Sequence, residues 1–151
     1  MHHANLCSHQ LFLDSGVWQV AGYYLDRSKH KYDVMGSFTV SCLDAVLTTQ
    51  SCLTLSEQGG KRYTNNRIIE PFLPNQNATK WRSSHSLMGA IQGSFTFVDD
   101  AILSSFRSAN QYYVGSECLI NVFEGEYSSR GAVLAAGKRL VSWRIDLTRE
   151  R

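Results

Sequence analysis

The feature that most constrains the fold of this chain is a repeated alternation of apolar and polar residues in short segments. The segment from Tyr32 to Leu43 shows it most clearly, because every second side chain would lie on the same face of a strand. Gly, Asn, Asp or Ser residues separate the segments, as expected at turns. No long segment has the spacing of an amphipathic helix. The sequence therefore predicts an all-β protein.

Ten such segments follow one another, and short turns connect most of them. Short links favour antiparallel pairing of consecutive strands. A meander of this length can remove its unpaired edges by closing on itself, so we expect a single up-and-down antiparallel β-barrel of about 8–10 strands. A β-sandwich is the alternative, but its Greek-key connections are longer than those seen here. The predicted strands span residues 16–25, 32–43, 46–55, 62–69, 78–87, 91–98, 101–108, 111–123, 127–135 and 139–149.

Length and composition agree with one domain. The 151 residues match the usual size of a single domain, so we expect one barrel over 1–151, with a partly ordered segment at 1–13 that includes a short apolar stretch. Apolar residues make up 43% of the chain, enough for a core, and no apolar run approaches the ~20 residues of a membrane span. The 15 basic and 13 acidic residues nearly balance, which argues against a nucleic-acid partner.

The beginning of the chain and its cysteines indicate a cytoplasmic protein. Residues 1–10 lack the basic and apolar regions of a secretory signal. Cys7, Cys42, Cys52 and Cys118 form no Cys-x-x-Cys pair, so we expect reduced thiols, although Cys42 and Cys52 could meet across a hairpin. Three histidines among the first nine residues invite a metal interpretation, but a chain terminus is a poor place for a site, and we predict no metal.

Two short motifs suggest a family. Gly16-Val17-Trp18 opens the first predicted strand, and Ser142-Trp143-Arg144 lies in the last one. This combination resembles the calycin superfamily, which includes the lipocalins, the fatty-acid-binding proteins and the avidin-like proteins. The resemblance implies a lipocalin-like barrel in which Trp18 closes one end and Arg144 covers its ring. The lipocalin Thr-Asp-Tyr triplet and carboxy-terminal helix are absent, and no helical lid separates the first two strands.

A barrel of this size leaves room for a small ligand among mostly apolar side chains. Each of the pairs Tyr23-Tyr24 and Tyr112-Tyr113 places one ring inside, whatever the register. In the fifth strand Trp81, Ser83 and His85 share a face. The candidate ligand-binding residues are Tyr24, Phe38, Trp81, His85, Arg107, Tyr113 and Glu117.

The eighth strand has two possible orientations. The face that holds Val114, Cys118 and Ile120 is the drier one, so the pattern favours it as the interior and turns Glu117 toward solvent. If Glu117 lies inside instead, we expect Arg107 or Arg82 to be the partner of its carboxylate.

Three functions fit these observations. The first is binding of a small hydrophobic or planar molecule inside the barrel. The second is a barrel enzyme of isomerase, cyclase or chromophore-lyase type, with a polar cluster of His85 and Glu117 or Tyr113, in which His85 acts as a general base or as a haem or metal ligand. The third is a dimeric interaction protein with Tyr23, Met35 and Trp143 or Arg144 facing outward. No hydrolase, metalloprotease or phosphate-loop motif is present, and the sequence specifies neither cofactor nor ligand.

Overall fold

The computed structural model describes residues 9–57, 59–72 and 76–151. In this part of the chain, one helical turn precedes ten strands, and the predicted all-β class is confirmed. The elements in order are α1 (Gln10–Leu13), β1 (Gly16–Asp26), β2 (Lys31–Leu43), β3 (Val46–Leu55), β4 (Lys61–Ile69), β5 (Ala78–His85), β6 (Gly89–Val98), β7 (Ala101–Ser108), β8 (Tyr113–Phe123), β9 (Glu126–Ala135) and β10 (Lys138–Arg149).

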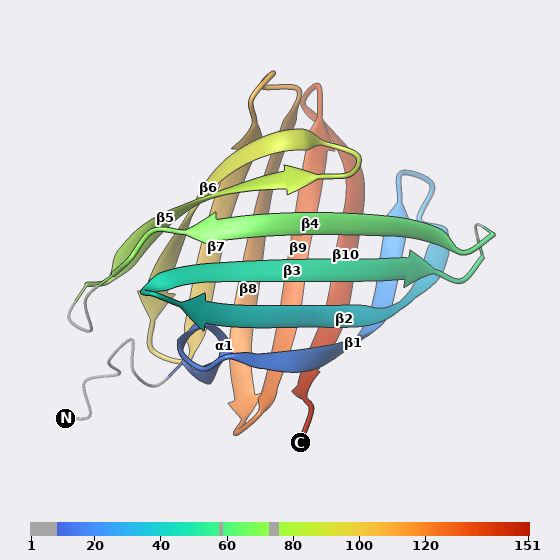
Figure 1. Cartoon of the computed structure of the whole chain (residues 1–151). Helices are drawn as coiled ribbons and strands as arrows, with labels where there is room; N and C mark the ends of the chain where they lie inside the picture. Colours follow the sequence, from blue (N-terminus) through green and yellow to red (C-terminus); the bar gives the residue numbers. More distant parts are fainter. Residues whose placement is uncertain (1–8, 58, 73–75) are drawn as a thin grey trace.

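The strands form a closed barrel, as predicted (Figure 1). Each strand pairs antiparallel with the next one along the chain, and β1 closes the barrel by pairing with β10. The sandwich alternative is therefore excluded. The predicted strand limits differ little from those observed; the largest shifts, two residues each, are the end of β5 at His85, the start of β6 at Gly89 and the start of β8 at Tyr113.

Two of the connections are two-residue hairpins with a left-handed backbone. Asp44 and Ala45 join β2 to β3 with φ of 51° and 63°, and Ala136 and Gly137 join β9 to β10 with φ of 51° and 79°. Positive φ at both central residues belongs to the type I′ turn, whose twist matches that of the flanking strands. These tight links keep consecutive strands together and produce the simple strand order.

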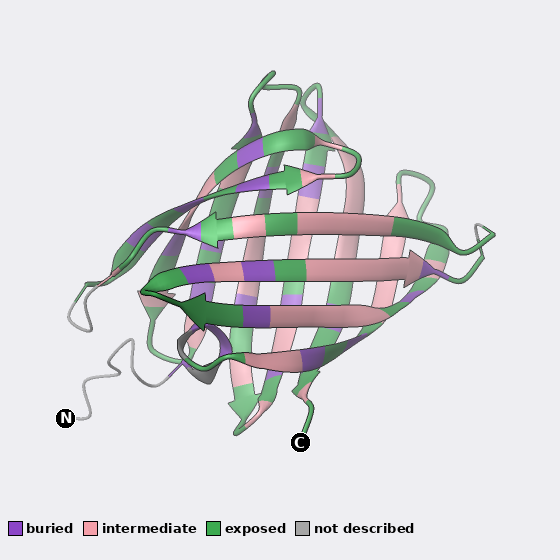
Figure 2. Ribbon diagram, viewed as in Figure 1, coloured by how far each residue is buried: buried purple, intermediate pink, exposed green. Residues whose placement is uncertain are grey.

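Buried and exposed residues alternate along parts of the strands, most clearly in β5 and β7. Figure 2 marks the buried residues as purple bands on the ribbon. At the end of the barrel where β1 begins, the interior is filled with rings. Trp18 is fully buried and meets Tyr127 edge to face, with ring centroids 5.7 Å apart. Leu11 and Phe12 of α1 are also buried there, and Phe12 stacks on Phe95 at 4.7 Å. We call this region the closed end.

The prediction that Arg144 covers the Trp18 ring is wrong, because a different arginine of β10 lies over the ring. Arg149, not Arg144, is the register partner of Trp18, and its guanidinium carbon lies 5.9 Å from the centre of the indole ring. Arg144 pairs with Tyr23 and is exposed on the outer surface. The calycin motif placed the cation on the correct strand, but β10 continues beyond the Ser-Trp-Arg motif to the closed end. Trp18 itself lies where the resemblance implied.

His9 belongs to the closed end as well. Its Nε2 lies 2.8 Å from the backbone carbonyl of Asp99, and its Nδ1 lies 2.8 Å from the hydroxyl of Tyr127. Because a carbonyl can only accept, Nε2 donates, and in the neutral ring Nδ1 accepts the Tyr127 proton. Burial lowers the pKa of His9. His2, His3 and Cys7 lie outside the described residues, as does most of the predicted terminal segment.

The strand ladders are not equally long. β4 and β5 share only five register pairs, Asn65–Ile69 against Trp81–His85, whereas the other ladders have seven to ten. Residues 61–64 therefore extend past the end of β5 with little backbone pairing on that side. We call this short ladder the β4–β5 seam.

Two further sequence predictions can be compared with the structure. Cys42, Cys52 and Cys118 are free, so Cys42 and Cys52 do not pair across their hairpin. The described part of the chain contains no helix with the length and apolar character needed to traverse a bilayer.

Candidate functional site

The interior of the barrel contains a cavity of about 440 Å³. Its floor is formed by Leu11 and Phe12 at the closed end, and its walls continue to the turns at the opposite end, where Asp26, Lys61 and Met88 line it. Most of the lining is apolar or aromatic. The polar lining residues are Asp26, Tyr32, Thr49, Ser51, Lys61, Tyr63, Thr64, Asn65, Arg67, His85 and Glu117, with Tyr24 and Trp143 contributing mainly rings.

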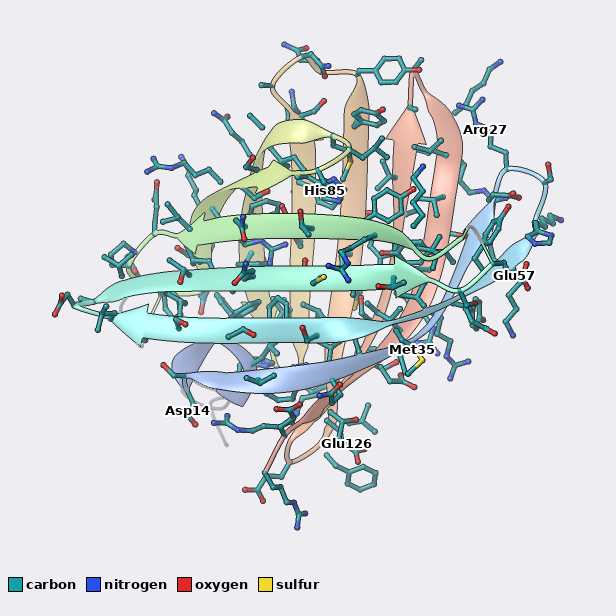
Figure 3. All side chains as sticks on the ribbon, turned by 45° about the vertical axis from the view of Figure 1, so that its right-hand side comes forward. Asp14, Arg27, Met35, Glu57, His85 and Glu126 are labelled. Carbon is teal, nitrogen blue, oxygen red and sulfur yellow. The ribbon has the colours of Figure 1, made fainter. Side chains whose placement is uncertain are left out.

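Four of the seven candidate residues line this cavity: Tyr24, Phe38, His85 and Glu117. Figure 3 shows His85 among the side chains enclosed by the strands, while Met35 projects from the outer surface. The other three candidates lie elsewhere. Trp81 is buried in the interior wall behind Arg67, Tyr113 is half-buried near the turn between β7 and β8, and Arg107 is exposed on the outer face of β7.

The preferred orientation of β8 is wrong. Gly115, Glu117 and Leu119 point inward, while Val114 and Ile120 are 44% and 37% exposed. The reason is the hollow interior: a cavity accommodates a carboxylate, and Gly115 leaves space for the ring of Phe106. The drier face of a strand is therefore not always the inner face of a wide barrel.

Glu117 is held by a short chain of hydrogen bonds. Ser129 Oγ donates to Glu117 Oε2 at 2.6 Å, and Trp143 Nε1 donates to Ser129 Oγ at 3.1 Å. The Tyr24 ring lies 5.9 Å from the Trp143 ring, and burial, with the nearby Glu117 charge, raises the pKa of the Tyr24 phenol. Tyr24 is therefore a neutral hydroxyl beside an oriented carboxylate.

The cation that faces Glu117 is Arg67, so the expected partners Arg82 and Arg107 are wrong; both lie on the outer surface. The Arg67 guanidinium stacks on Trp81, with its central carbon 4.2 Å from the ring centre, and also lies 5.2 Å from the centre of Phe95. Burial lowers the pKa of Arg67 to about 10, against an opposing effect of Glu117, so the side chain stays charged at neutral pH. Within the described ranges, no carboxylate lies within 4.0 Å of it.

His85 is fixed by the turn that follows β5. The backbone amides of Leu87 and Met88 both donate to its Nδ1, at 3.0 and 3.2 Å. The ring lies 6.2 Å from the Tyr63 ring and nearly parallel to it. Burial lowers the pKa of His85, which favours the neutral ring. The remaining nitrogen, Nε2, has no hydrogen-bond partner among the described residues.

Sequence reasoning missed the cavity side of β4. Tyr63, Asn65 and Arg67 all line the cavity. The signal was present, because Tyr63 and the buried Ile69 lie on one face of this strand with Asn65 and Arg67 at the positions between them, although Ile68 gives the other face an apolar residue as well. The polar residues were overlooked because Arg and Asn in a strand normally face solvent.

Of the two alternatives for the outer face proposed for dimerisation, Arg144 lies on the outer surface and Trp143 does not. Trp143 points inward and lines the cavity. Met35 is 69% exposed and Arg144 is exposed, while Tyr23 is half-buried under Lys31, whose amine lies 4.5 Å from the ring centre. Whether the chain forms dimers remains a prediction. Over the described residues, no three His, Cys, Asp or Glu side chains are grouped so that they could hold a metal ion.

Comparison with known proteins supports the fold. No family model matches the sequence, and no curated protein matches it with significance. Among solved structures, an S-type phycobiliprotein lyase from Guillardia theta superposes with a TM-score of 0.68 at 9% identity, over 90% of this chain and 88% of that chain. The protein Rv2717c from M. tuberculosis superposes with a TM-score of 0.69 at 15% identity, over 100% and 99% of the two chains. These neighbours support the fold alone, a closed ten-stranded antiparallel barrel.

Proposed function

We propose that the protein binds a small, mostly apolar and planar molecule inside the barrel. The observation that carries this proposal is the cavity of about 440 Å³ inside the barrel, a volume within the usual range for ligand sites of roughly 300–1,000 Å³. Aromatic side chains such as Phe38, Phe106 and Trp143 offer flat contact surfaces, and a few polar groups among them can fix the orientation of a ligand.

A neutral fluorescent probe tests the proposal. N-phenyl-1-naphthylamine should bind saturably at one site per chain, with a rise in its emission as it leaves water. Leu53→Trp, which places a ring in the cavity from β3, should weaken binding at least tenfold. The matched control is Gln50→Trp, which places the same ring on the exposed outer face of that strand and should leave the affinity unchanged.

A wild-type protein that gives no saturable signal would contradict the proposal. So would equal affinities for the Leu53→Trp and Gln50→Trp variants, because the probe would then bind outside the barrel.

A chromophore lyase is the second candidate. Its support is the shared fold with a phycobiliprotein lyase and the presence of two polar groups, His85 and Glu117, along one cavity. This function predicts that a linear tetrapyrrole such as biliverdin binds with a red shift or sharpening of its absorption, and that Leu53→Trp abolishes the change. An unaltered biliverdin spectrum at saturating protein would remove this candidate and leave the binding of smaller ligands intact.

A further inference from the structure

Buried polar atoms without hydrogen-bond partners concentrate on one wall of the cavity. In the described part of the chain there are six: Trp18 Nε1 and Arg149 Nη1 at the closed end, and four on the interior face of β4 and β5. Folded proteins pair the great majority of such groups, so a local cluster of unpaired ones indicates a ligand or bound water. The four atoms are Asn65 Oδ1, Arg67 Nε, Trp81 Nε1 and Ser83 Oγ. We call Asn65, Arg67, Trp81, Ser83 and His85 the β4–β5 wall.

These residues are neighbours in the sheet. Asn65 is the register partner of His85, and Arg67 is the register partner of Ser83. Directly opposed side chains in an antiparallel pair have Cβ atoms about 5 Å apart, and diagonal ones about 7–8 Å apart, which long side chains span. One small ligand group can therefore contact Arg67, Asn65 and His85 together, and these three are the members of the wall that line the cavity.

The wall presents mainly donors. Arg67 Nε and Trp81 Nε1 each carry a hydrogen and cannot accept. His85 supplies a further donor. The backbone amides of the turn after β5 donate to its Nδ1, and this nitrogen must therefore carry a lone pair to accept them. Nδ1 is therefore unprotonated, and the single hydrogen of the neutral ring sits on Nε2.

This tautomer excludes two of the roles considered for His85 from the sequence. A nitrogen that carries a hydrogen has no lone pair to bind a metal ion or to act as a general base, and Nδ1 is occupied by the turn. His85 is instead a donor whose direction is fixed by the backbone of residues 87 and 88.

Charge selects among the acceptors that could meet these donors. Arg67 is a cation held against the Trp81 ring, and no described carboxylate lies within 4.0 Å of its nitrogens. Glu117 acts on it only at longer range, and its Oε2 already accepts from Ser129. A planar anion with two acceptor oxygens matches a guanidinium edge and a neighbouring imidazole N–H.

Resting on the proposed function, we infer that the cavity ligand is an aromatic or conjugated carboxylic acid whose carboxylate accepts hydrogen bonds from Arg67 and from His85 Nε2. Its apolar body then lies along the aromatic and aliphatic lining toward Phe38 and Phe106. Asn65 lies beside His85 in the sheet, but its unpaired atom is Oδ1, an acceptor, so this oxygen makes no hydrogen bond to the ionised acid.

A pair of ligands that differ only in the acid tests this inference. Isothermal titration calorimetry would measure the affinity of 2-naphthoate and of methyl 2-naphthoate for the intact chain. We expect the wild type to prefer the acid at least tenfold. Arg67→Met should bring the ratio close to one without changing the affinity for the ester, while Arg82→Met, the matched change on the outer face, should leave the ratio unaltered.

Two more variants keep the test independent of folding defects. Arg67→Lys retains the charge and should retain most of the preference for the acid. His85→Asn keeps an acceptor for the amides of Leu87 and Met88 but lacks the Nε2 donor, so the preference should fall about three- to tenfold. Long-range proton–nitrogen NMR spectra should show the His85 hydrogen on Nε2.

The outcomes separate the two proposals. Equal affinity of the wild type for acid and ester would overturn the carboxylate inference and leave the binding function standing. Binding of neither compound would contradict the proposed function itself, together with the inference. A hydrogen on Nδ1, or an Arg67→Met variant with an undiminished preference, would also overturn the inference.

Discussion

At the residue scale, the closed end depends on a single arginine. Arg149 stacks near Trp18, donates from Nη2 to the backbone carbonyl of Ser15 at 3.0 Å, and lies 3.9 Å from Asp14. Arg149→Met should lower the free energy of unfolding by about 1–2 kcal/mol, because a cation–π contact and a charged hydrogen bond disappear. Urea denaturation of the variant and of the wild type measures this difference in the free energy of unfolding.

The control comes from the same strand. Arg144→Met changes the same residue type at an exposed position, so its effect should stay within about 0.5 kcal/mol. Equal losses for the two variants would show that Arg149 has no special role at Trp18.

His9 makes the stability dependent on pH. Burial lowers the pKa of His9 in the folded protein below 6.5, its value in an unfolded chain, so below that pH the unfolded state binds more protons. The contribution of His9 is therefore complete above pH 6.5 and is lost as the pH falls from there through the folded pKa. His85, whose pKa is also lowered, acts in the same direction.

The experiment is urea denaturation between pH 8 and pH 5. His9→Gln keeps a donor for the Asp99 carbonyl but does not titrate, so its unfolding free energy should decline less with acidification than that of the wild type. A steeper decline in the variant would contradict the neutral, buried state of His9.

At the scale of single elements, Gly93 and Gly131, like Gly115 on β8, make room for rings on neighbouring strands. The Trp81 ring on β5 lies against Gly93 on β6, and the Trp143 ring on β10 lies against Gly131 on β9; an added Cβ at either glycine would overlap the ring. Gly93→Ala should therefore displace Trp81, lower stability by about 1–3 kcal/mol, and move the guanidinium of Arg67 that rests on it.

Fluorescence and binding measure this effect. We expect a shift in tryptophan emission and a reduced preference for 2-naphthoate over its methyl ester. Gly60→Ala, in the turn before β4 where nothing lies within 4 Å, provides a comparison that should leave ligand preference unchanged, although its φ of 74° carries a small backbone cost of its own. If Gly93→Ala and the wild type have the same preference for the acid over the ester, Trp81 does not position the Arg67 guanidinium for ligand binding.

The elements were also the part of the structure that the sequence predicted best. Period-two alternation and turn residues located all ten strands, because both signals arise within a few residues of each other. The orientation of β8 and the partner of Glu117 could not be predicted in this way. Each depends on which strands meet across a hollow interior, and the polar residues of β4 become informative only when the register of the closed barrel is known.

At the scale of the whole molecule, a bound ligand should stabilise the complete barrel, because nine of the ten strands contribute lining residues to the cavity and the barrel is closed. A ligand at 100 times its dissociation constant adds about 2.7 kcal/mol, which corresponds to a rise in Tm of roughly 5–10 °C for a chain of this size. Differential scanning calorimetry with N-phenyl-1-naphthylamine should show this rise for the wild type and for Gln50→Trp.

Leu53→Trp supplies the opposite case. With its cavity occupied by its own indole ring, this variant should melt at the same temperature with and without the probe. A ligand-dependent rise equal to that of the wild type would mean that the stabilising site lies outside the barrel.

The short β4–β5 seam affects how fast a bound ligand exchanges with ligand in solution. The seam holds fewer backbone pairs than any other junction, and it carries Arg67, Asn65 and His85 on its inner side. A ligand that is bound by both β4 and β5 links the two strands where the barrel has the fewest backbone pairs. Separation of β4 from β5 and dissociation of the ligand then occur together. The residence time of the ligand therefore depends on how often these two strands separate, and not on how often the entire chain unfolds.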